Sequence, residues 1–252
     1  MAKRIELMGC PVDNLNMTET IAVAEKYIKN RALCQHVVVN VAKLVAMRND
    51  PALKEIISNC DIINADGMPL VWASRLLGSP LSCRVAGVDL FQDLIGVCAD
   101  RGYLPYFFGA KQWVVEKVVT SFKKQYPNLD VAGFRNGYFD KSEEKQIADD
   151  INKSRADMLF VGFSSPMKEN FLNKWMQEMQ VPFCMGVGGS FDIVAGKTLR
   201  APVWMQQAGL EWFYRVLQEP KRMWKRYAKT NPVFIWMVLK ELVKKDLETL
   251  KK

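Results

Sequence analysis

Short apolar runs that alternate with helical segments fill the first 194 residues of this chain, and no other feature restricts its fold as strongly. Helical segments are expected at 18–30, 41–49, 51–59, 88–101, 112–126, 142–154 and 168–179, and apolar runs at 36–40, 61–64, 103–109, 130–133, 157–163 and 182–188. Such runs, apolar on both sides, are typical of parallel strands buried between two helical layers. We therefore predict an α/β fold, a Rossmann-like doubly wound parallel sheet with helices on both faces.

The chain changes character after residue 194. Residues 1–194 carry 22 Lys+Arg and 22 Asp+Glu, whereas residues 195–252 carry 13 and 5, so the whole net charge of +8 lies at the C-terminal end. Three helical segments are expected there, near 202–217, 220–229 and 232–250, with Pro220 and Pro232 as breaks. We predict an α/β domain at 1–194 and a basic amphipathic helical appendage at 195–252. The appendage either docks on an anionic membrane surface or packs on the domain.

Several classes of protein are not expected. The six cysteines form no C-x-x-C pair and the only histidine, His36, precedes an apolar run, so neither a zinc site nor a histidine base is predicted. The apolar run at 233–239 has seven residues, whereas a membrane-spanning helix needs roughly 20. No leader of the secretory type opens the sequence, and we expect a cytoplasmic protein.

Polar residues and glycines follow the predicted strands, where ligands bind in open parallel sheets. Both common nucleotide-binding motifs, G-x-x-x-x-G-K-[ST] and G-x-G-x-x-G, are missing, as is the metal-chelating D-x-D, so no metal or other cofactor is expected. Glycine lets backbone N–H groups approach a phosphate, although glycine also simply ends strands. The residues at these positions are Asn40, Asp66, Gly67, Gly109, Gly137, Tyr138, Gly162, Gly188, Gly189 and Asp192.

Asp66 and Arg84 are the charged candidates for a site. Asp66 follows a predicted buried strand, where partial desolvation raises the pKa of a carboxylate and makes it a usable base. The alternative is an Asp-Gly turn formed with Gly67. Arg84 lies among small residues and is suited to hold a phosphate or a carboxylate, but a surface arginine fits the same spacing.

A series of motifs along residues 5 to 230 resembles the WecG/TagA/CpsF family of bacterial glycosyltransferases. The motifs are Asn40, Asp66-Gly67, Arg84-Val85-Ala86-Gly87, Tyr126-Pro127, Gly137-Tyr138-Phe139, Gly162, Pro166-Met167-Lys168-Glu169, Gly186-Val187-Gly188-Gly189-Ser190-Phe191-Asp192, Arg200-Ala201-Pro202, Gly209-Leu210-Glu211-Trp212, Tyr214-Arg215, Glu219-Pro220 and Arg226-Tyr227. The resemblance implies an inverting, metal-independent transferase. Its reaction would move N-acetylmannosamine, the corresponding uronic acid or a related hexose from UDP to an undecaprenyl-diphosphate-linked acceptor, in cell-surface polysaccharide synthesis.

The resemblance also implies roles for individual residues. Asp66 is expected as general base, Asn40 as a polar group of the pocket, and Arg84 as a contact to acceptor or phosphate. The appendage would dock the enzyme on the inner face of the cytoplasmic membrane and bring Arg215 and Arg222 to the diphosphate of the acceptor or to the leaving diphosphate. A homo-oligomer is compatible with the sequence, and no nucleic acid is expected as a partner. The donor UDP-sugar would lie against Gly109, Tyr138, Gly162, Lys168, Gly188, Gly189 and Asp192.

Three positions depart from the family pattern, which usually has threonine, threonine or serine, and glutamine where this chain has Val38, Ala86 and Lys168. Two hydroxyls are therefore lost and one cation is gained. Lys168 is suited to pair with a carboxylate of the donor, such as a uronic acid, or with a phosphate. Alternatively it replaces glutamine as a hydrogen-bond donor to a neutral sugar.

Two other functions fit parts of the sequence. A Rossmann-type nucleotide-dependent oxidoreductase fits the fold, but the missing G-x-G-x-x-G opposes it. A non-catalytic basic module that binds nucleic acid fits the charge and tryptophans of residues 195–252, but the neutral body opposes it.

Overall fold

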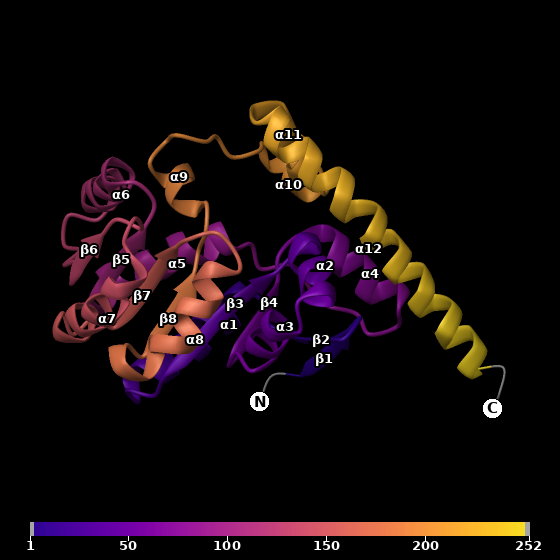
Figure 1. The fold of residues 1–252 in the computed structure, drawn as a ribbon, viewed down its shortest axis with the longest axis horizontal. Helices are drawn as coiled ribbons and strands as arrows, with labels where there is room; N and C mark the ends of the chain where they lie inside the picture. Colours follow the sequence, from indigo (N-terminus) through magenta and orange to yellow (C-terminus); the bar gives the residue numbers. More distant parts are fainter. Residues whose placement is uncertain (1–2, 250–252) are drawn as a thin grey trace.

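The computed structural model describes residues 3–249 and contains a central six-stranded sheet (Figure 1). The strands lie in the order β4–β3–β8–β7–β5–β6, and every pairing is parallel. Their bounds are β3 Cys34–Val39, β4 Ile62–Ala65, β5 Pro105–Gly109, β6 Gly133–Arg135, β7 Met158–Gly162 and β8 Phe183–Gly186. The predicted parallel sheet is therefore confirmed, although β6 begins three residues later than expected.

Helices cover both faces of this sheet, as the apolar runs predicted. Side chains alternate between the faces along each strand, so Phe107 lies in one core and Phe108 in another. The first face is covered by α1 Met17–Lys29, α5 Gly87–Arg101, α6 Gln112–Gln125 and α9 Ser190–Val194. The second face is covered by α2 Val41–Asn49, α3 Pro51–Ser58, α7 Glu144–Lys153 and α8 Met167–Met179.

Four elements of the body have no counterpart in the sequence-based prediction. They are strands β1 Arg4–Leu7 and β2 Cys10–Asp13, which form an antiparallel hairpin, and helices α4 Met68–Leu76 and α9 Ser190–Val194; the short 3-10 helix η1 Lys141–Glu143 overlaps the start of the segment predicted at 142–154. The carboxylate of Asp13 fixes the hairpin, because it pairs with Arg4 at 2.7 Å and accepts a hydrogen bond of 2.8 Å from Ile63 N–H in β4. This long-range contact could not be read from local pattern.

The C-terminal residues form three helices, α10 Val203–Gln207, α11 Glu211–Gln218 and α12 Pro220–Thr249. Pro220 starts α12 as expected, but the predicted break at Pro232 was wrong, since Pro232 lies inside α12. An internal proline costs about 3 kcal/mol, whereas a fully buried apolar side chain contributes about 1.5–3 kcal/mol. Met223, Phe234 and Val238 of α12 are all buried, so packing offsets the cost.

Helix α12 runs beside α2 and α4 in Figure 1. Phe234 and Val238 share a core with β1, β2, α2, α3 and α4, so this part of the appendage packs on the body. No helix within residues 3–249 combines the length and the apolar character that crossing a bilayer requires.

Candidate active site

Two adjoining cavities, each of about 530 Å³, open at the carboxyl end of the sheet. The first, called here the apolar groove, lies between α4 and α12. The second, called the polar cavity, lies over the loops that follow β7 and β8. The side chains that line both are Asn40, Ala42, Asp66, Glu211, Arg215 and Arg226. Asp66 therefore lies where a polar and an apolar space meet.

Asp66 directly follows β4 and is held rigidly. Its N–H donates a 2.7 Å hydrogen bond to the carbonyl of Val39, which ties the ends of β4 and β3 together. Gly67 then takes φ +109°, a conformation that favours glycine, and α4 begins at Met68. The Asp-Gly pair thus makes a turn and also directs a carboxylate into the site, so the two sequence interpretations of Asp66 are compatible.

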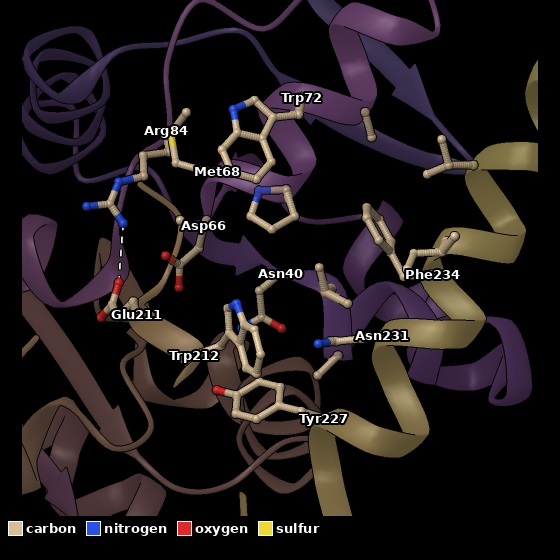
Figure 2. A pocket seen from close by; sticks show the side chains of 18 of the residues that line it. Asn40, Asp66, Met68, Trp72, Arg84, Glu211, Trp212, Tyr227, Asn231 and Phe234 are labelled. Atoms are coloured by element: carbon tan, nitrogen blue, oxygen red, sulfur yellow. Dashed lines mark hydrogen bonds and ion pairs between the residues drawn. The ribbon is translucent and has the colours of Figure 1, made fainter. Parts of the chain in front are cut away.

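The surroundings of Asp66 suit a proton acceptor. The pKa of this carboxyl is raised to about 6, chiefly by burial and also by the nearby carboxylate of Glu211, against the opposing effect of the Arg215 and Arg84 cations. At neutral pH the group is mostly ionised and yet more basic than an ordinary aspartate. Figure 2 shows Asp66 facing the open space between α4 and the appendage.

Asn40 and Arg84 are both engaged by the protein. The Oδ1 atom of Asn40 caps α2 by accepting a 3.1 Å hydrogen bond from Lys43 N–H, and the side chain lines both cavities. Arg84 lines the apolar groove, pairs with Glu211 at 3.3 Å and donates a 3.1 Å hydrogen bond to Gln206 (Figure 2). The appendage thus reaches the loop that precedes α5 through two polar contacts.

The appendage supplies several cations to the site. Arg215 lines both cavities and lies 3.7 Å from Glu211, whereas Arg222 lines only the polar cavity and pairs with Glu219 at 2.7 Å. Arg226 lines both cavities, and Tyr227 and Trp212 line the apolar groove. Glu211, Trp212, Arg226 and Tyr227 belong to motifs that match the family, although no role is predicted for them from the sequence. Their presence in those motifs was the sequence signal that could have placed them at the site.

The structure separates the predicted donor residues into two groups. Lys168, Gly188, Gly189 and Asp192 line the polar cavity together with Asp66. Gly109, Tyr138 and Gly162 line neither cavity, and Tyr138 is 69% exposed. Gly109 and Gly162 are paired in register, and a Cβ on Gly109 would lie 2.7 Å from the Gly162 backbone. Close strand packing explains those glycines, and nucleotide binding there stays a prediction.

The two residues that lack the family's hydroxyl groups also lie in the polar cavity. Val38 and Ala86 line its wall and are 9% and 4% exposed. This wall is therefore apolar where a hydroxyl would offer a hydrogen bond to a sugar.

His36 and most of the cysteines are buried in the body. His36 is buried in β3, its Nε2 lies 2.9 Å from Asn64 Oδ1, and burial lowers its pKa to about 4. Within residues 3–249, no three His, Cys, Asp or Glu side chains are grouped so as to hold a metal ion. The cysteines of that range are free thiols, and all but Cys83 are buried.

A family model and individual relatives both match almost the whole of this chain. Residues 5–248 match the family model described as "Glycosyl transferase WecG/TagA/CpsF family". A protein of Bacillus subtilis (strain 168) is 34% identical over 92% of this chain and 89% of its own length. A Staphylococcus aureus (strain MW2) protein is 27% identical over 94% and 92%. Both relatives are named N-acetylglucosaminyldiphosphoundecaprenol N-acetyl-beta-D-mannosaminyltransferase.

Proposed function

This chain belongs to the WecG/TagA/CpsF family of glycosyltransferases, and from that membership we propose that it transfers N-acetylmannosamine or a related hexose from a UDP-sugar to an undecaprenyl-diphosphate-linked acceptor. The product would enter cell-wall polysaccharide synthesis. The observation that carries this proposal is the position of Asp66 between a polar cavity rich in cations and an apolar groove. A donor nucleotide and a lipid-linked acceptor would then meet at one carboxylate.

In the proposed reaction, Asp66 acts as the general base. An acceptor hydroxyl gives its proton to the Asp66 carboxylate while its oxygen forms a bond to the anomeric carbon of the donor. The bond between that carbon and the β-phosphate oxygen breaks, and the electron pair leaves with UDP. Attack opposite the leaving group inverts the anomeric configuration. Arg215 and Arg222 would neutralise the departing diphosphate by charge-assisted hydrogen bonds.

The apolar groove suits the lipid chain of the acceptor. Trp72 and Leu76 of α4 line one side, and Ile235, Leu239 and Leu242 of α12 line the other. Its inner end reaches Asp66, Arg215 and Arg226, so a chain lying in the groove would place its diphosphate beside cations and its sugar beside the base. We assign the groove to the polyprenyl chain because most of the side chains of α4 and α12 that line it are apolar, while its inner end carries the charged groups.

Docking of the appendage on an anionic bilayer at the cytoplasmic face completes the proposal. Trp204, Trp224 and Trp236 are 63%, 65% and 58% exposed, in the segment that carries the whole net charge of +8. Each Lys or Arg near an anionic surface contributes about 1 kcal/mol, and exposed tryptophans suit the interface. Such docking would present the apolar groove to the acceptor in the membrane.

A donor panel tests the proposed function. Radiolabelled UDP-N-acetylmannosamine, UDP-N-acetylglucosamine and UDP-N-acetylmannosaminuronic acid would each be incubated with N-acetylglucosaminyl-diphosphoundecaprenol. We expect one of the mannosamine donors to label the lipid with inverted anomeric configuration, read by NMR of the product. Absence of transfer from all three donors would contradict the proposal.

Metal removal should leave the activity essentially unchanged. The chain has no D-x-D motif, and the proposed leaving group is neutralised by arginines, so no divalent ion is needed to hold the diphosphate. Initial rates in EDTA and in excess Mg²⁺ or Mn²⁺ would be compared after chelator treatment of the enzyme. Activity that appears only with added metal would overturn this assignment of the donor site.

The pH dependence of kcat/KM should report Asp66. Because its pKa is raised to about 6, the rate should rise as pH increases through that value, where the carboxyl becomes the active carboxylate. Glu211→Gln removes a neighbouring negative charge, so the acid limb should move to lower pH. Glu219→Gln is the matched control, since that carboxylate pairs with Arg222 instead. If Glu211→Gln did not move the acid limb, the limb would not report Asp66 under the influence of Glu211.

A further inference from the structure

A buried lysine lies at the floor of the polar cavity. Lys168, in the first turn of α8, is only 9% exposed. Its side chain lies across Gly186, the last residue of β8. A Cβ on Gly186 would lie 2.7 Å from Lys168 Cδ, and a Cβ on Gly188 would lie 3.2 Å from Lys168 Nζ. These two glycines leave the space that the lysine occupies, so its ammonium group is held beside the turn after β8.

The charges around Lys168 do not balance. The nearest carboxylate oxygen, Glu169 Oε1, is 3.8 Å from Lys168 Nζ and already pairs with Lys43 Nζ at 2.8 Å. Lys43 and Glu169 are 6% and 2% exposed, so three buried charged groups sum to one net positive charge when all are ionised. Within residues 3–249, no oxygen accepts a hydrogen bond from Lys168 Nζ. A buried ammonium group without its own anion is unfavourable unless a ligand supplies one.

The end of α8 adds to this positive environment. Helix N-termini carry a partial positive charge, and α8 has no side-chain cap because Pro166 occupies the N-cap position. Ser164, Ser165 and Pro166 line the same cavity as Lys168. The pKa of Lys168 is lowered to about 8, chiefly by burial and also by the charges of Lys43 and Arg226, while Glu169 and Asp66 oppose the fall. A bound anion would favour the charged form.

We infer that Lys168 is the anion-binding residue of the donor site and takes an oxyanion of the sugar nucleotide, on its diphosphate or on a carboxylate of a uronic acid donor. The inference rests on the proposed function in that the ligand is a sugar nucleotide. The inference adds that the ligand must carry an acidic group. That group would lie deep in the polar cavity, in contact with Lys168 Nζ and close to the turn at Gly188.

Calorimetric titration of the full-length protein tests this inference without requiring turnover. Uridine, UDP, UDP-N-acetylmannosamine and UDP-N-acetylmannosaminuronic acid would be titrated into the wild type and Lys168→Gln. Loss of a charge-assisted hydrogen bond should weaken the affinity about 10- to 100-fold. Lys174→Gln is the matched control, since Lys174 lies on the same helix but pairs with Glu144 outside the cavity. Uridine affinity should not change.

The pattern of losses identifies the anion. If the diphosphate is bound, UDP and both sugar nucleotides lose affinity for Lys168→Gln equally. If the carboxylate is bound, only the uronic acid donor does so. In either case the affinity of the wild type should fall above pH 8, and Lys168→Gln should lack that fall. Lys168→Met, which keeps the volume without a donor, provides a second variant should Lys168→Gln fail to fold.

Equal affinities of the wild type, Lys168→Gln and Lys168→Met for all four ligands would overturn the inference. Failure of the proposed function would look different. In that case the donor panel would give no lipid product, whether or not UDP binding depends on Lys168.

Discussion

Asp66→Asn should lose about 10²- to 10⁴-fold in turnover, the range that removal of a general base typically costs. The amide has the size of the carboxylate but cannot accept the proton of an acceptor hydroxyl at neutral pH. UDP binding should persist, because the donor contacts proposed here come from Lys168, Arg215 and Arg222. Initial rates with the lipid-linked acceptor and calorimetry with UDP would measure the two effects separately.

Asp50→Asn is the control for this experiment. Asp50 also lines the polar cavity, but it caps α3 by accepting a 3.0 Å hydrogen bond from Leu53 N–H, and asparagine caps helices equally well. The control should therefore retain near wild-type turnover. If Asp66→Asn also retained it, the general base would have to be another residue.

The stability of Asp66→Asn offers a second readout. The folded-state pKa of Asp66 is raised to about 6, above that of an unfolded aspartate, so its ionisation destabilises the fold as pH rises through that value. Removing the ionisable group should therefore preserve or raise the melting temperature at pH 7. A variant that is as stable as the wild type but inactive would show that Asp66 is needed for the reaction and not for folding.

Local pattern was sufficient for the parts of the fold that depend on neighbours in sequence. The helices expected at 18–30 and 51–59 are present, and local contacts start both of them: a capping box of Asn16 and Glu19 in α1, and a cap by Asp50 before Pro51 in α3. Apolar runs identified the six parallel strands, and the position of Asp66 after one of them placed it at the ligand-binding edge of the sheet. These features follow from backbone hydrogen bonding and side-chain periodicity alone.

Contacts between distant segments account for what the sequence did not reveal. The continuity of α12 through Pro232 depends on burial of Phe234 and Val238 against the body. The carboxylate that acts on Asp66 belongs to Glu211 of α11, which lines both cavities and pairs with Arg84 of the body. Arg226 likewise enters both cavities through the placement of α12. Periodicity within one segment carries no information about such pairings.

The apolar groove provides the second large effect that we expect. Ile235→Gln combined with Leu239→Gln places two amides on the lining while keeping good helix formers on α12. Each exchange should weaken the free energy of binding to a lipid chain by about 1–2 kcal/mol, so KM for the undecaprenyl acceptor should rise at least about 10-fold. UDP affinity should be unchanged, because neither residue lines the polar cavity.

Two comparisons separate a groove for the lipid chain from a membrane-facing surface. Val243→Gln combined with Leu247→Gln is the matched pair, since both are exposed residues of α12 that line neither cavity. An acceptor with only two isoprene units should show no difference between the groove variant and the wild type, because its chain is too short to fill the groove. If the groove pair raised KM equally for short and long acceptors, or if the control pair did the same, the lipid chain would have to lie elsewhere. A rise confined to the long acceptor and the groove pair would mean that α12 contributes to substrate binding and is more than a tether to the membrane.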